Sequence, residues 1–296
     1  MKGNKRLNYI LIYILTCLIV LIFVGRKVSK SLFFNPKDRI QVLVYGQYTR
    51  LYSIGNSDGV HYVIPFDSDT KLKVPGGYGL YRIGGLLKLI DLKKDKEILK
   101  RTFSVGISSY VSYILYPRKS TIYYSNNKVE RNQGLPSLFT FFWEQSNISF
   151  FDKIYLGLRF LGKKPSDFTE IDIKTQIINE DKVFLDAVFS KMFIGYFYQR
   201  KFRDEQKSIQ LLFQNNYQTA VFLSNLIEGN GIRVNDISQK KDGDNCEVIE
   251  STQNHFSETA LSLSQFFNCP LKQGEPEISD IILYLGEIEK KWEVNK

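Results

Sequence analysis

Asp67 and Asp69 stand two positions apart, and their spacing suggests chemistry more directly than that of any other pair in this sequence. On a strand they would share one face, where their carboxylates could bind a divalent cation through oxygen ligands. In a loop they would make turn hydrogen bonds instead. Arg50 and Arg82 are candidates to hold a phosphate group, with surface or structural roles as the alternative. These four residues are the candidate catalytic set, and the two aspartates are also the candidate metal ligands.

Two of the three cysteines, Cys246 and Cys269, lie near the end of the chain. The first opens an expected strand, and the second ends the helix that returns antiparallel to that strand, so both reach the same end of one small module. An exported module would favour a disulfide between them, and two separate buried thiols are the alternative. Neither Cys-x-x-Cys nor His-x-x-x-His spacing occurs, so no zinc site is expected. No pattern predicts a bound cofactor.

An uncharged apolar run, Leu7 to Val24, has three basic residues on each side. As a helix it would be roughly 27 Å long, close to the hydrocarbon thickness of a bilayer. It lacks the pair of small residues that marks a cleaved signal peptide, and apolar side chains occupy every face, which is atypical of a buried soluble helix. The run therefore predicts an uncleaved single-pass transmembrane anchor. Because the two flanks carry equal numbers of basic residues, their charges do not indicate which end of the helix faces the cytoplasm.

The charge distribution divides the chain into three regions. Residues 1–30 carry a net charge of +6, residues 31–204 carry +9, and residues 205–296 carry −6. A basic middle and an acidic end indicate separate folded bodies, so we expect a membrane anchor and linker over 1–36 and domains over 37–204 and 205–296. The basic middle favours phosphate-bearing lipids or anionic wall polymers, with a solvated lysine-rich surface as the alternative. Nucleic acid is not expected, because the basic residues are spread out.

The periodicity predicts an α/β fold in both domains. In the central domain, alternation indicates strands over 40–44, 51–54, 61–66, 110–116 and 121–124. Helical spacing there follows at 80–92, 95–105, 135–145, 150–161 and 181–197. The last domain is predicted to be a small βαββαβ unit, with strands at 208–213, 232–237, 246–250 and 280–285 and helices at 219–229 and 258–267.

The last domain resembles the C-terminal domain of LytR-type cell-envelope proteins. The resemblance rests on the strand Ser208 to Phe213 with Gln214-Asn215-Asn216 after it, on Gly231-Ile232-Arg233-Val234, and on a late strand that ends in Leu285-Gly286. It covers about 90 residues. In that family the first strand ends in Asn-Gly, where this chain has Asn215-Asn216.

The central domain is similar, more distantly, to the LytR-CpsA-Psr catalytic domain. Val63-Ile64-Pro65-Phe66-Asp67 stands where that family carries Ile-Pro-Arg-Asp. The resemblance implies transfer of glycopolymers from a polyprenyl pyrophosphate carrier onto peptidoglycan, with arginines holding the pyrophosphate and acids holding magnesium. Phe66 replaces the arginine, and the segment 46–50 lacks the aspartate of the family's first motif. Phenylalanine has no guanidinium group, so it cannot make the paired, charged hydrogen bonds with which an arginine binds phosphate.

The sequence therefore predicts a degenerate domain of this kind. We expect a non-catalytic envelope protein that is anchored in the cell membrane through residues 7–24, with a cytoplasmic N-terminus and the bulk of the chain outside. Its expected partners are an anionic wall polymer, a polyprenyl phosphate lipid or another envelope protein. The alternative is a divergent transferase that uses Arg50, Asp67, Asp69 and Arg82 with magnesium. A third possibility places the folded part in the cytoplasm.

Overall fold

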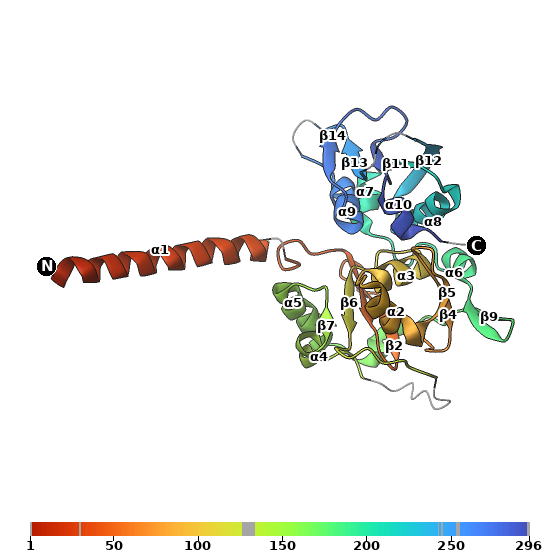
Figure 1. The fold of residues 1–296 in the computed structure, drawn as a ribbon, viewed down its shortest axis with the longest axis horizontal. Coiled ribbons are helices and arrows are strands. Elements are labelled where there is room, and N and C mark those ends of the chain that lie inside the picture. Colours follow the sequence, from red (N-terminus) through yellow and green to blue (C-terminus); the bar gives the residue numbers. More distant parts are fainter. Residues whose placement is uncertain are drawn as a thin grey trace. The chain divides into compact units, whose positions relative to one another are not determined.

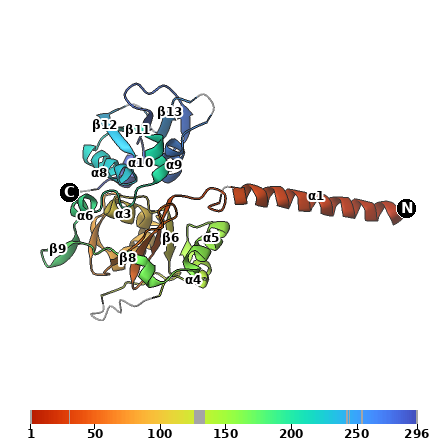
Figure 2. The same cartoon turned by 180° about the vertical axis from the view of Figure 1, so that it is seen from behind.

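The structure, a computed structural model, describes residues 2–29, 31–125, 134–241, 243, 245–252 and 255–294, with side chains in the first helix from Tyr13 onward. The chain forms two compact units that are built from interleaved segments. Unit 1 comprises residues 1–37, 135–143 and 148–163, and unit 2 comprises residues 38–134, 144–147 and 164–296. Figures 1 and 2 show the elements of both units from opposite sides.

Unit 1 consists of a long helix and a helical pair. Its helices are α1 (Lys2–Ser29), α4 (Leu138–Trp143) and α5 (Phe150–Leu161). Ser149 caps the N-terminus of α5 by accepting a hydrogen bond from the backbone N–H of Asp152. The Asp152 carboxylate in turn accepts a hydrogen bond of 2.8 Å from the backbone N–H of Leu32, so the segment after α1 is attached to the start of α5.

In the part of the chain that the structure describes, no helix is both long enough and apolar enough to cross a membrane. The transmembrane helix predicted over residues 7–24 is therefore not confirmed.

The largest sheet of unit 2 has six strands in the order β7-β6-β1-β2-β3-β8. The first three strands of the sequence form an antiparallel meander, and β6 and β8 join it in parallel next to β1 and β3. Most residues of β1 and β2 are buried, so both faces of the sheet are covered. Its strands are β1 (Arg39–Val44), β2 (Thr49–Gly55), β3 (His61–Phe66), β6 (Tyr113–Tyr116), β7 (Gln145–Ser146) and β8 (Phe168–Glu170).

A second sheet, of order β5-β4-β10-β9, corrects two predictions from the sequence. The helix expected over 80–92 begins as a strand and becomes helical only from residue 83, and the helix expected over 181–197 also begins as a strand. Asn179 and Glu180 both have positive φ and form a two-residue turn of the type that closes hairpins, so the residues after them pair back on β9. The strands are β4 (Lys71–Val74), β5 (Gly79–Arg82), β9 (Thr175–Ile178) and β10 (Asp181–Phe184).

The prediction of a strand over 121–124 is also wrong. This segment is irregular, and the Tyr123 N–H donates a hydrogen bond of 2.9 Å to the carbonyl of Gly84. A side chain at Gly84 would collide with the backbone carbonyl of Tyr123, which explains a glycine at the start of the helical region. The close approach of these two backbones takes the place of strand pairing.

Helices close the main core of unit 2. α3 is buried along almost its whole length, and its Phe103 has no exposed surface. The core combines residues from α2 and α3 with the inner faces of both sheets and with Phe189 from α6. The helices are η1 (Ile83–Gly85), α2 (Leu86–Lys93), α3 (Ile98–Ile107), η2 (Pro165–Asp167), α6 (Asp186–Met192) and α7 (Arg200–Glu205).

The C-terminal part of unit 2 has its own sheet, of order β12-β11-β15-β13-β14, and its own core. The predicted βαββαβ elements are all present, but the pattern omits β14, which pairs in parallel with β13, and a last helix, α10. Both are short, with three and five residues, so they carry little periodic signal. The elements are β11 (Ser208–Phe213), α8 (Tyr217–Glu228), β12 (Arg233–Gln239), β13 (Glu247–Glu250), α9 (Glu258–Phe267), β14 (Leu271–Gln273), β15 (Ile281–Tyr284) and α10 (Ile288–Trp292).

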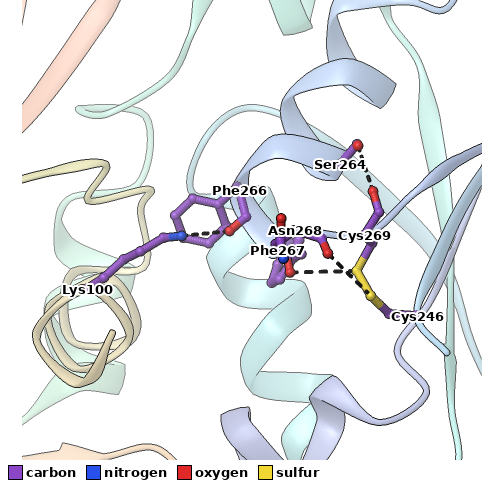
Figure 3. The surroundings of a disulfide bond; sticks show 7 residues. All are labelled: Lys100, Cys246, Ser264, Phe266, Phe267, Asn268 and Cys269. Carbon is purple, nitrogen blue, oxygen red and sulfur yellow. Dashed lines mark hydrogen bonds between the residues drawn. A yellow bond between two sulfur atoms is a disulfide. The ribbon is translucent and has the colours of Figure 1, made fainter. Parts of the chain in front are cut away.

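A disulfide joins Cys246, before β13, to Cys269, just after α9, with the two Cα atoms 5.3 Å apart. Figure 3 shows this end of α9. Ser264 donates a hydrogen bond of 2.6 Å to the carbonyl of Cys269, and Lys100 of α3 donates one of 2.8 Å to the carbonyl of Phe266. The disulfide thus fixes the end of a helix that also contacts α3.

Candidate functional site

A cavity of about 290 Å³ opens at the ends of β2, β3, β8 and β10. It contains two of the four candidate catalytic residues, Arg50 and Asp67. Its other charged residues are Lys182, Glu170 and Asp172, none of which the sequence pattern singled out. The remaining lining residues are Gln47, Tyr48, Thr49, Pro65, Phe66, Ser68, Ser125 and Ile173.

Asp67 lies at the centre of the ionic contacts in this cavity. Lys182 Nζ is 2.9 Å from Asp67 Oδ2, and the backbone N–H of Asp69 donates a hydrogen bond of 3.1 Å to Asp67 Oδ1. Burial opposes ionisation of Asp67, but the hydrogen bonds from Lys182, from the Asp69 backbone and from Ser125 outweigh it and hold the pKa of Asp67 below its usual value. The carboxylate is therefore charged at neutral pH and neutralised by a neighbouring ammonium group.

Asp69 and Arg82 are close to each other and outside the set of residues that line the cavity. Arg82 Nη1 lies 3.4 Å from Asp69 Oδ1, and the backbone N–H of Ser125 donates a hydrogen bond of 3.1 Å to Asp69 Oδ2. Asp69 thereby holds the chain segment that carries Ser125 against the cavity. Arg50 hydrogen-bonds with Tyr52, its neighbour two positions along β2. Arg50 lines the cavity and Arg82 does not. The structure therefore does not place the two guanidinium groups where both could bind the same phosphate.

The donor set at Asp67 and Asp69 does not fit magnesium. Within the described residues, no group of three or more acidic, histidine or cysteine side chains is arranged to hold a metal ion. The position next to the Asp67 carboxylate is filled by the Lys182 ammonium group, which would repel a divalent cation. Magnesium prefers several oxygen ligands in octahedral geometry, and this pair does not supply them.

Phe66, which stands where the resemblance implies an arginine, belongs to the hydrophobic core. It is 4% exposed, and its ring centroid lies 5.0 Å from that of Phe103, nearly perpendicular to it. The ring is packed against α3 as part of the hydrophobic core. The side chain forms an apolar part of the cavity wall and offers nothing to a phosphate.

The cavity lining combines carboxylate, amide and hydroxyl groups with cationic and apolar side chains. Among the described residues of the lining, three are carboxylates and two are cations. Carboxylate, amide and hydroxyl oxygens accept hydrogen bonds from hydroxyl groups, and the amide and the hydroxyls also donate them. Tyr48, Pro65 and Phe66 add apolar surface. The sequence pattern did not indicate Lys182 and Glu170 as site residues, because it did not predict the strands β10 and β8 to which they belong.

The sequence matches no family model, and no curated protein matches it. Solved structures that overlap with the chain include TagT of Bacillus subtilis, with 10% identity, a TM-score of 0.35, and coverage of 53% of this chain and 88% of that chain. TagU of B. subtilis overlaps with 8% identity, a TM-score of 0.34, and coverage of 53% and 94%. The transcriptional regulator yvhJ of the same organism overlaps with 11% identity, a TM-score of 0.36, and coverage of 53% and 96%.

TagT and TagU are LytR-CpsA-Psr proteins, the family that the central domain resembles in sequence. At TM-scores this low, no conclusion about the present chain rests on the overlap. None of these comparisons shows the LytR-type C-terminal domain.

Proposed function

We propose that this chain is a membrane-anchored, extracytoplasmic cell-envelope protein that binds wall glycopolymer without transferring it. The contact between Asp67 and Lys182, at 2.9 Å inside the cavity, is the observation that carries the proposal. In a metal-dependent transferase that carboxylate would have to be available to a divalent cation. In a binding protein the same pair can hold a fixed pattern of hydrogen-bond donors and acceptors.

The exposed side chains of α1 support a membrane anchor. Between Tyr13 and Val24 the helix exposes ten large hydrophobic side chains, each at least 39% accessible. The apolar run of the sequence also includes the six residues before Tyr13, where side chains are not described. Leaving such a surface in water is unfavourable by roughly 25 cal/mol for each Å² of apolar area, whereas lipid covers it. The disulfide between Cys246 and Cys269 favours an oxidising location for the folded part.

The cavity lining suits a sugar unit of the polymer better than it suits a phosphate group of the polymer. Glu170 and Asp172 can accept hydrogen bonds from sugar hydroxyls, and Tyr48 offers an aromatic ring to the apolar face of a sugar. The phosphates of an anionic polymer would then lie outside the cavity, where the net charge of +9 over residues 31–204 favours them. The second candidate function, a divergent transferase, is favoured by one observation, namely that Arg50 and Asp67 line the same cavity.

Equilibrium binding tests the proposal. The full chain in detergent micelles is titrated with soluble fragments of wall glycopolymer, and heat release gives the dissociation constant. Replacing Glu170 with alanine should weaken binding about tenfold, which corresponds to the loss of one hydrogen bond of roughly 1.4 kcal/mol. Glu277→Ala, which removes an exposed carboxylate from a loop that does not line the cavity, is the matched control and should leave binding unchanged. Absence of binding, or equal weakening by both substitutions, would refute the assignment to this cavity.

A further inference from the structure

Unit 1 displays a cluster of exposed aromatic side chains on its helical pair. The cluster, called here the aromatic face, consists of Phe139, Phe142 and Trp143 of α4 and Phe150 of α5. Their exposed fractions are 67%, 39%, 58% and 62%. Trp143 stacks on Phe139 with ring centroids 5.3 Å apart, and Phe142 meets Phe150 at 5.7 Å. The two pairs are neighbours because Phe139 lies three and four residues before Phe142 and Trp143 on α4. Large apolar patches of this kind mark sites of interaction with proteins or membranes.

The aromatic face is distinct from the side by which α4 and α5 hold each other. Phe141, with no exposed surface, packs on Phe160 with ring centroids 5.7 Å apart. Gly157 of α5 lies so close to Leu138 that a side chain there would force the leucine side chain to move. Phe139, Phe142 and Trp143 are spaced three and four residues apart and therefore share the other side of α4. The pair thus has a packed side of its own, and the aromatic face is left outside it.

The aromatic face is continuous with the end of α1. Phe23, which is 60% exposed, lines a cavity of about 710 Å³ together with Phe150 and Phe151. Phe33, just after α1, packs edge-on against Tyr155 of α5 at 5.3 Å. Figures 1 and 2 both show α5 beside the end of α1. The exposed apolar surface of α1 is thus followed directly by that of the helical pair.

Two basic residues lie beside this surface, because Arg26 and Lys27 line the same cavity as Phe23 and Phe150. Asp152, the one acidic residue among the described residues of that lining, accepts hydrogen bonds from Leu32 and Ser149. Aromatic rings flanked by lysine and arginine are typical of protein surfaces at the level of lipid headgroups, where the cations attract anionic lipids.

We propose that the aromatic face docks on an anionic lipid bilayer, in the same membrane that holds α1. The proposal rests on the membrane attachment proposed above and adds a second contact with the lipid. Insertion of the four rings would fix the orientation of the helical pair on the membrane surface. Attachment through α1 alone would not fix that orientation. A protein partner on the aromatic face is the competing occupant, and the experiment separates the two.

Tryptophan fluorescence tests the docking directly, because the chain has two tryptophans, Trp143 and Trp292. The second is 4% exposed in the C-terminal core, so the full chain with Trp292→Phe reports on the aromatic face alone. This variant is reconstituted in vesicles of phosphatidylcholine and phosphatidylglycerol with or without bromine atoms on the acyl chains. We expect the brominated lipids to quench Trp143 emission by roughly half, as for a ring at the interface. The matched variant Trp143→Phe, which retains Trp292, should show no quenching.

Flotation of the vesicles separates the possible failures. If the chain floats with the vesicles and Trp143 is not quenched, docking is wrong while the membrane attachment stands. If the chain does not float, both the attachment and the docking are wrong. Blue-shifted Trp143 emission without quenching by bromine would assign the aromatic face to protein contacts and also overturn the docking. A further variant, Phe139→Ser with Phe142→Ser, should float and lose most of the quenching.

Discussion

Removing the disulfide between Cys246 and Cys269 should lower the free energy of unfolding by about 3 kcal/mol in the chain-entropy treatment of a loop of this length. The two residues are separated by 23 positions, and both side chains are buried. Without the bond, the end of α9 is held only by packing and hydrogen bonds, among them the bond from Lys100 to the carbonyl of Phe266. Double replacement by alanine and urea unfolding of the full chain measure the effect.

Cys17→Ala serves as the control for this prediction. Cys17 is exposed in α1 and is not bonded to another cysteine, so its replacement should leave the unfolding midpoint unchanged. Thiol titration of the denatured, unreduced wild-type chain should detect Cys17 alone. Detection of all three thiols in protein from the cell envelope, or an unchanged midpoint in the double variant, would contradict both the bond and its contribution.

The second large effect is expected at Asn230, which lies just after α8 with no exposed surface. Its Oδ1 accepts hydrogen bonds from the hydroxyl of Ser109 at 3.0 Å and from the backbone N–H of Tyr110 at 3.1 Å. Its Nδ2 donates one of 2.7 Å to the carbonyl of Leu226. Asn230→Ala leaves these three groups without that partner in a buried setting, so we expect a loss of about 2–4 kcal/mol of unfolding free energy.

The same residue connects the two cores of unit 2, because Ser109 follows α3 and Leu226 belongs to α8. Thermal unfolding followed by circular dichroism measures the loss. Asn215→Ala, at an exposed position, is the matched control and should change stability by less than about 0.5 kcal/mol. A loss at Asn230 no larger than at Asn215 would show that water replaces the three bonds at little cost.

The sequence predicts the C-terminal elements well because α8, α9 and β11 are regularly patterned over twelve, ten and six residues. The expected helix over 258–267 coincides with α9, and the expected strand over 208–213 coincides with β11. The pattern fails where an element is short or its partner is distant in sequence. β10 has four residues and follows a turn set by the positive φ of Asn179 and Glu180, which hydrophobic spacing does not reveal.

The candidate site shows the same limit. Asp67 could be singled out because its neighbour Asp69 is also an acid, and the structure places Asp67 in the cavity. Lys182 is separated from Asp67 by 115 positions, so no local pattern could connect them. Whether an aspartate is free to bind a metal depends on such distant partners. The sequence therefore identifies a candidate carboxylate, and only the fold supplies the ammonium group that neutralises it.

Transfer activity of the full chain tests most directly whether the cavity binds glycopolymer without reacting with it. The chain in detergent is mixed with glycan on polyprenyl pyrophosphate, peptidoglycan and magnesium, and released polyprenyl phosphate is measured over time. Since Lys182 neutralises Asp67, we predict release no faster than in the absence of protein. Release that requires the chain and disappears in Asp67→Asn would contradict this account and identify the protein as a transferase.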